Sequence, residues 1–411
     1  MSSKKKKNKM ERGLTNRHVQ VMAIAGTIGT GLFLGAGRSI SLTGPSIVLI
    51  YMITGAFMFL MMRAVGEMLY QDPEQHTFIN FITRHLGKGW GYFSVWSYWL
   101  SVVFIGMAEI TAIAHYVQFW FPSWPSWLIQ VVFLTILGLV NLIAVKIFGE
   151  VEFWFAMIKI VAILAMIATG IFMVLTGFET PYGSASLVNI SEQFSLFPNG
   201  GMNFVMAFQM VFFAYLMIEF IGVTTSETKD PRKVLPKAVK EIPLRIIFFY
   251  GGALLAIMSI IPWRELSATD SPFVTVFELV GLKWAAALIN FVVLTSAASA
   301  LNSTLYSTGR HLYQIAHDSP NRFLKAIKAD TLSRHNVPQN AIIASAVLIG
   351  LAAFINVLPG VSDAFALITA SSSGVYIAIY ILIMVAHLKY RKSKDFMADG
   401  YLMPQYRLLN P

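Results

Sequence analysis

The 411-residue chain contains no cysteine, which excludes disulfide bonds and thiolate metal sites and leaves the redox compartment open. Charged residues are also scarce: they make up 13% of the chain, about half the share found in soluble domains. Hydrophobic residues account for 56%, and the mean hydropathy is +0.63. A soluble protein of this composition would need a larger core than single domains build. The composition therefore predicts an integral membrane protein.

Motifs of soluble enzymes are absent as well. The sequence has no phosphate-binding loop for ATP and no nucleophile–base pair or paired carboxylates at plausible spacing. His317 and His335 lie in a basic loop without partners at metal-ligand spacing. The lysines at 4–7 are followed by polar residues instead of a short apolar run and a cleavage site, so we expect no signal peptide. We therefore predict no enzymatic activity, no cofactor and no resident metal.

Ten apolar stretches are each long enough to cross a bilayer, which takes about 20 residues. They cover residues 19–40, 45–67, 91–119, 126–145, 152–176, 203–224, 244–262, 284–308, 341–358 and 364–388. If the N-terminus lies inside, the outer segments carry only Arg38, Arg264 and Lys283, while most other basic residues lie inside. The positive-inside rule thus predicts a multi-pass membrane protein with both termini in the cytoplasm. Because the net charge of +10 is confined to alternate loops, we expect lipid and not nucleic acid as its surroundings.

Ten spans divide into two halves of five, and an odd number of spans gives the halves opposite orientations, as in inverted-repeat transporters. The expected all-α organisation comprises a basic cytoplasmic tail (1–18), a first five-helix repeat (19–177), an outer loop (178–202), a second repeat (203–388) and a cytoplasmic tail (389–411). Residues 77–87 alternate apolar and polar side chains and predict a short interfacial helix.

Three glycines interrupt the first span in the stretch Gly26-Thr27-Ile28-Gly29-Thr30-Gly31. Each glycine weakens a helix by about 1 kcal/mol relative to alanine. Unwound backbone at membrane depth is tolerated where it is buried in protein or lines a cavity, and there it can hold a carboxylate and an ammonium group. Close packing of two helices is the alternative explanation. The inverted repeat predicts a second break in the sixth span, where Glu219 interrupts the apolar run and no glycine occurs before Gly222.

Several further stretches accompany the glycine motif: Arg12-Gly13-Leu14, Gly44-Pro45-Ser46, residues 149–155, residues 227–231 and residues 295–303. Together they resemble the bacterial amino acid permeases of the amino acid transporter family, within the amino acid–polyamine–organocation superfamily, over about residues 12–390. Gly106-Met107-Ala108-Glu109 and residues 118–122 look most like the D-serine/D-alanine/glycine permeases. The chain departs from this family in having no spans 11 and 12, and in having Met217 where the family commonly has glycine.

The resemblance implies a zwitterionic amino acid bound between the two broken helices. Its carboxylate would meet backbone N–H groups, and its ammonium would meet carbonyls of both helices. The N–H groups would come from Ile28, Gly29, Thr30 and Gly31, and the carbonyls from Ala25, Gly26, Phe213 and Ala214. Phe213 and Tyr215 would lie beside the substrate side chain, with Phe213 as the lid; core packing is the alternative for both rings.

Lys159 lies within the otherwise apolar fifth span, where a lysine is costly and by default functional. In relatives, a lysine at this place lies near spans 1 and 8, where sodium-coupled members hold Na⁺, so protonated Lys159 would replace the cation. Snorkelling towards the inner surface is the alternative. Glu109 and Glu219 are two further intramembrane carboxylates, each a candidate proton site, ammonium partner or structural hydrogen-bond acceptor.

Ser296 and Ser299 give span 8 a small polar face, which either packs on span 1 or contacts an ion or the substrate. The leading hypothesis is a proton-coupled importer of a small neutral amino acid that works by alternating access. An exchanger without net proton flux is one alternative, and a non-transporting amino acid sensor or truncated remnant is another. The sequence leaves the identity of the amino acid and the oligomeric state open.

Overall fold

The computed structural model describes residues 28–73, 77–143, 148–192, 194–219, 231–279, 281, 283–318, 322–333, 337–355, 357–358 and 363–406. The described part is helical apart from a short antiparallel hairpin formed by β1 (Glu179–Thr180) and β2 (Gly183–Ser184) in the predicted outer loop. The predictions for the tail 1–18, Ala25 and Gly26 lie outside the described residues.

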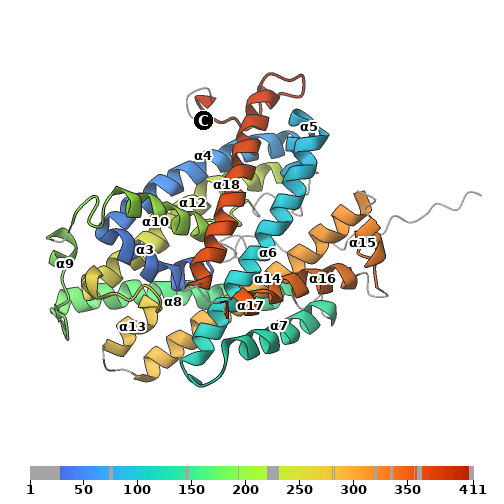
Figure 1. Ribbon diagram of the computed structural model, residues 1–411. Coiled ribbons are helices and arrows are strands. Elements are labelled where there is room, and N and C mark those ends of the chain that lie inside the picture. The colour runs from blue at the N-terminus through green and yellow to red at the C-terminus, as the bar shows by residue number, and fades with distance from the viewer. Residues whose placement is uncertain are drawn as a thin grey trace, which may run out of the picture.

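The helices of the two halves follow one another along the chain (Figure 1). The first half contains α2 (Thr30–Phe33), α3 (Gly35–Thr43), η1 (Gly44–Ser46), α4 (Ile47–Gln71), α5 (Ile79–Leu86), α6 (Lys88–Gln118), α7 (Ser126–Ile143) and α8 (Phe148–Thr176). Helix α9 (Val188–Ser191) lies in the predicted outer loop. It is followed by α10 (Gly201–Ala214), α12 (Pro231–Ile260), η2 (Trp263–Glu265), α13 (Pro272–Leu279), α14 (Lys283–Asp318), α15 (Arg322–Ala326), α16 (Gln339–Gly350), α17 (Ala352–Ile355) and α18 (Ala364–Tyr390).

Six helical stretches of the described chain are long and apolar enough to cross a membrane. They are Gly35–Gln71, Lys88–Gln118, Trp154–Thr176, Leu235–Ile260, Lys283–Asp318 and Ala364–Tyr390. Three shorter apolar helices are Ser126–Leu142, Gly201–Ala214 and Gln339–Ile355. All nine stretches overlap predicted spans, which confirms a helical multi-pass architecture, while the exact number of ten crossings stays a prediction.

The long helix α6 lies at the centre of the described fold, where it packs against α14, α18, α5 and α7. Helix α12 packs against α4 and α8, and α10 packs against α3, α4 and α18. The predicted short helix at 77–87 is present as α5, whose Ile79, Phe81 and Ile82 are buried. This arrangement brings the two interrupted segments, before α2 and after α10, into the interior of the helix assembly.

A buried ion pair joins α4 to the end of α18 and to the segment that follows it. Glu67 of α4 lies 2.5 Å from Arg391 Nε through Oε1 and accepts a hydrogen bond of 2.5 Å from Arg391 Nη2 through Oε2. The backbone N–H of Met403 donates to the same Oε2 at 2.7 Å. Arg63 lies over the ring of Tyr401, with 4.0 Å between its guanidinium carbon and the ring centroid. The chain after α18 therefore returns to cover the end of α4.

Candidate functional site

At the place of the predicted first break, the backbone of Gly29 is extended (φ −129°, ψ −157°), and α2 begins at the next residue, Thr30. Helix α2 passes into α3 at Leu34, which has right-handed helical geometry. A Cβ atom built on Gly31 would lie 2.8 Å from the Cα of Ala214, the last residue of α10. The structure therefore brings two of the predicted substrate-binding segments into direct contact, at a distance that only glycine permits.

Glu109 of α6 lies at the start of α2, although the two residues are far apart in the sequence. Its Oε1 accepts hydrogen bonds from the backbone N–H of Thr30 at 3.4 Å and from the Thr30 hydroxyl at 3.2 Å. A Cβ atom on Gly29 would lie 2.8 Å from the same oxygen. A negative charge is favourable at the start of a helix, where backbone N–H groups lack intrahelical partners. Glu109 is 3% exposed, and its second oxygen, Oε2, has no hydrogen-bond partner in the described part of the chain.

Lys159 of α8 is enclosed by the protein, with only 1% of its surface exposed. It interacts electrostatically with Glu109, so the buried lysine and the buried carboxylate influence each other's charge. A lysine that reaches out of the helix assembly would be more exposed than this. The geometry thus favours a role inside the protein over snorkelling, and the proton-coupling role stays a prediction.

The serine face of α14 lies against the first break, as the sequence pattern predicted. The hydroxyl of Ser296 donates to the carbonyl of Ile28 at 3.5 Å, a long hydrogen bond. Ser299 lies one helical turn further along and is fully buried. Helix α14 also packs directly on α2. The Ser296 contact is consistent with packing on the first span, and ion or substrate contact of the two serines stays a prediction.

Helix α10 ends at Ala214, in the middle of the span predicted at 203–224 and at the place of the predicted second break. Residues 215–219 form turns, and residues 220–230 lie outside the described part. Met217 has a positive φ of 69°, in the left-handed region that favours glycine. The backbone at this position thus has the conformation suited to the glycine that the family commonly has there.

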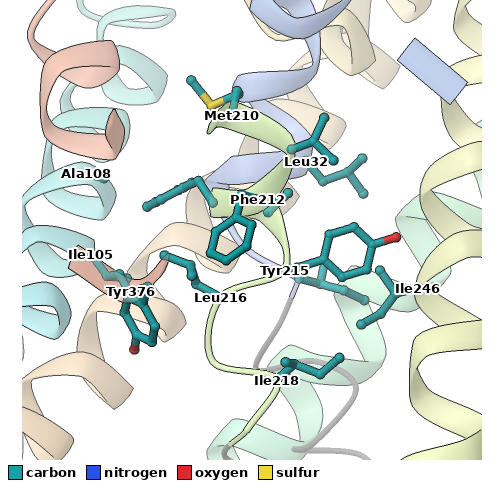
Figure 2. Close-up of a cluster of buried hydrophobic side chains, with 14 of the residues drawn as sticks. Leu32, Ile105, Ala108, Met210, Phe212, Tyr215, Leu216, Ile218, Ile246 and Tyr376 are labelled. Atoms are coloured by element: carbon teal, nitrogen blue, oxygen red, sulfur yellow. The ribbon is translucent and has the colours of Figure 1, made fainter. Parts of the chain in front are cut away.

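Tyrosine hydroxyls satisfy the polar groups of this second break. The hydroxyl of Tyr250 in α12 donates to the carbonyl of Ala214 at 3.2 Å, and the hydroxyl of Tyr215 donates to the carbonyl of Tyr51 in α4 at 3.0 Å. Figure 2 shows Tyr215 turned towards Ile246 of α12, while Tyr376 lies on the opposite side of the segment. The Tyr215 side chain thus supports the break from the side of α4 and α12.

Glu219 lies at the end of the same segment and is 1% exposed. Its Oε1 accepts a hydrogen bond from Tyr98 of α6 at 3.2 Å, and its Oε2 accepts one from Tyr380 of α18 at 2.6 Å. Both carboxylate oxygens therefore have partners, which favours the structural interpretation of Glu219. Sequence reasoning missed Tyr98, Tyr250 and Tyr380; the available signal was that an intramembrane tyrosine hydroxyl needs a polar partner.

Phe213, the predicted lid, is 5% exposed and packs edge-on against Phe365 of α18, with 6.3 Å between the ring centroids. It therefore connects the end of α10 to the beginning of α18. A movement of α18 relative to α10 would change the surroundings of this ring. Its role as a lid stays a prediction.

Comparison with known proteins identifies the family. Residues 18–400 match the amino acid permease family. The chain is 51% identical to the DL-alanine permease SerP2 of Lactococcus lactis subsp. cremoris (strain MG1363), over 98% of this chain and 88% of the relative. It is 48% identical to the serine permease SerP1 of the same strain, over 100% of this chain and 91% of the relative. It is 44% identical to the D-serine/D-alanine/glycine transporter of Escherichia coli (strain K12), over 97% and 85%, respectively.

These relatives are permeases and not enzymes, and they confirm the resemblance on which the site prediction rests. Together with the apolar helices, they identify a multi-pass bacterial membrane protein that transports amino acids. The chain belongs to the amino acid permease family.

Proposed function

We propose that this permease imports a small neutral amino acid across the cytoplasmic membrane by alternating access, coupled to protons. The observation that carries the proposal is the contact between the two broken helices, Gly31 against Ala214, beside the buried Glu109. Relatives that are named for alanine, serine and glycine support a small substrate. We also propose cytoplasmic termini and two inverted repeats, at 19–177 and 203–388.

The proposed binding site uses the backbone groups that the two breaks set free. The substrate carboxylate lies at the N–H groups of residues 28–31, and its ammonium lies at the carbonyls of Phe213 and Ala214, with Ala25 and Gly26 completing the site. Phe213 covers the substrate. Partial charges at helix ends bind a zwitterion without ionised side chains in direct contact. The close approach of Gly31 to Ala214 leaves no room for a side chain at position 31.

Proton coupling follows from the position of Glu109 in this proposal. Its Oε1 already accepts hydrogen bonds from the backbone N–H and the hydroxyl of Thr30. A substrate carboxylate at the same N–H groups would face a second carboxylate at short range, which is electrostatically costly in an apolar interior. A proton that arrives with the substrate and binds Glu109 removes this repulsion. Lys159 supplies the opposing positive charge in both states.

The direct test is uptake of radiolabelled alanine, serine and glycine into proteoliposomes with an imposed pH gradient. We expect accumulation against a concentration gradient only when the outside is more acidic than the inside. Counterflow of labelled against unlabelled amino acid that is independent of the pH gradient would instead show an exchanger. A folded protein that shows no ligand-dependent thermal stabilisation with any neutral amino acid would overturn the proposal.

A further inference from the structure

Tyr250 is a buried tyrosine whose hydroxyl reaches the end of α10. Its side chain is completely buried, and the hydroxyl donates to the carbonyl of Ala214 at 3.2 Å. The last carbonyls of any helix lack intrahelical partners. Those of Phe212 and Phe213 accept from the backbone N–H groups of Tyr215 and Leu216. The Ala214 carbonyl is instead contacted by a side chain from another helix.

The Tyr250 hydroxyl is held rigidly by its neighbours. Its ring packs edge-on against Tyr51, with 5.6 Å between the ring centroids, and at a tilt against Tyr215, at 6.1 Å. These contacts restrict movement of the ring and therefore fix the position of its hydroxyl oxygen beside the Ala214 carbonyl. A carbonyl oxygen has two lone pairs, and one hydrogen bond from Tyr250 leaves the second lone pair free to accept.

We propose that Tyr250 is a positioning residue, which holds the Ala214 carbonyl in the direction that accepts the ammonium group of the substrate. This inference rests on the proposed function, because it assumes an amino acid bound between the two breaks. Tyr250 does not touch the substrate; it acts through the peptide group of Ala214. The described residues 214–219 contain no glycine, and the Tyr250 hydroxyl contacts the Ala214 carbonyl from outside this segment.

The test measures selectivity for the ammonium group, using alanine and N-methylalanine as ligands. N-methylation replaces one N–H donor with a methyl group and keeps the positive charge. Tyr250→Phe removes only the hydroxyl, so the Ala214 carbonyl becomes free to turn. We expect the Kd of alanine to rise about tenfold, the loss expected for one hydrogen bond. We expect the Kd of N-methylalanine to rise much less, so that the ratio of the two values falls.

Two variants of the same tyrosine cluster serve as controls. Tyr51 is equally buried and contacts Tyr250, but its hydroxyl has no hydrogen-bond partner among the described residues. Tyr51→Phe should therefore leave both Kd values unchanged. Tyr215→Phe removes a hydrogen bond of similar length to the Tyr51 carbonyl. It should lower thermal stability, which gives the cost of losing one such hydrogen bond; its Kd values do not serve as a control, because Tyr215 is itself predicted to lie beside the substrate.

The ratio of the Kd values of alanine and N-methylalanine distinguishes a positioning role of Tyr250 from a purely structural one. If Tyr250→Phe weakens both ligands by the same factor, or changes neither, the inference is wrong while the proposed function stands. If the parent protein binds neither alanine nor any other neutral amino acid, both fail. Should the purified variant be unstable, competition of the two ligands against labelled alanine in intact cells gives the same ratio.

Discussion

At the first break, backbone N–H groups near Gly29 face the carboxylate of Glu109, whereas at the second break a carbonyl and the carboxylate of Glu219 are both contacted by tyrosine hydroxyls. Both breaks leave polar backbone in an apolar interior, where unsatisfied groups cost free energy. The two carboxylates differ in how many of their oxygens have hydrogen-bond partners. Glu219 has hydrogen-bond partners on both oxygens, whereas Oε2 of Glu109 has none within the described chain.

This difference assigns separate roles to the two carboxylates. A carboxylate that accepts hydrogen bonds on both oxygens stabilises one arrangement of the helices around it. Glu219 connects residues 215–219 to α6 and α18 in this way. A group with a free oxygen next to a cation can change its partners or its protonation. The comparison supports the proposal that Glu109 and Lys159 take part in proton coupling, while Glu219 holds the helices together. Four experiments on the two breaks and their charged residues follow, beginning with the largest expected effect.

Replacing Gly31 with leucine should abolish uptake. Its Cβ would lie 2.8 Å from the Ala214 Cα, a backbone atom that cannot move aside without displacing α10. The measurement is uptake of labelled alanine, normalised to the amount of protein in the membrane. Gly138→Leu is the matched control, because nothing lies within 4 Å of a Cβ there. Normal uptake by the Gly31 variant would show that the two breaks do not approach during transport.

Lys159→Ala should lose accumulation driven by the pH gradient, while any substrate exchange that remains should become nearly independent of pH. The reason is that the variant no longer has the buried positive charge opposite Glu109. Counterflow and gradient-driven uptake in the same proteoliposomes separate the two activities. Accumulation that still follows the imposed pH gradient would assign Lys159 to a structural role.

Glu109→Gln and Glu219→Gln form a matched pair, since each removes one buried charge and keeps the side-chain size. We expect Glu109→Gln to flatten the dependence of uptake on external pH. Glu219→Gln should keep that dependence but lower the free energy of unfolding by about 1–3 kcal/mol, because the tyrosine hydroxyls lose a charged acceptor. Uptake against pH and thermal unfolding measure the two effects. The reverse outcome would exchange the roles assigned here.

The smallest effect is expected at Met217. A non-glycine residue in the left-handed region costs about 1–2 kcal/mol, whereas glycine adopts it freely. Met217→Gly and Met217→Ala both remove the long side chain. The difference in stability between them therefore reports the cost of the backbone conformation. We expect the glycine variant to be the more stable by about 1 kcal/mol in thermal unfolding. Equal stability would show that the positive φ at this position does not strain the backbone.

The sequence predicted the parts of the fold that depend on local pattern. Apolar runs located the helices, and the glycines around Gly29 located the first break. The second break was expected from symmetry alone, because tyrosine and methionine carry no local signal for an interrupted helix. The contacts of Tyr250 with Ala214 and of Tyr98 with Glu219 join residues on different helices. Their partners depend on how the helices cross, which no short stretch of sequence contains.

The ion pair of Glu67 with Arg391 also constrains the order of assembly in the cell. The two residues are 324 positions apart. At a synthesis rate of about 5–20 residues per second, roughly 15–65 s pass between their emergence from the ribosome. An unpaired buried carboxylate is strongly destabilising, so during this interval the end of α4 has to stay hydrated at the membrane surface. The final packing at the end of α4 therefore depends on Arg391, which follows α18, a helix that is synthesised much later.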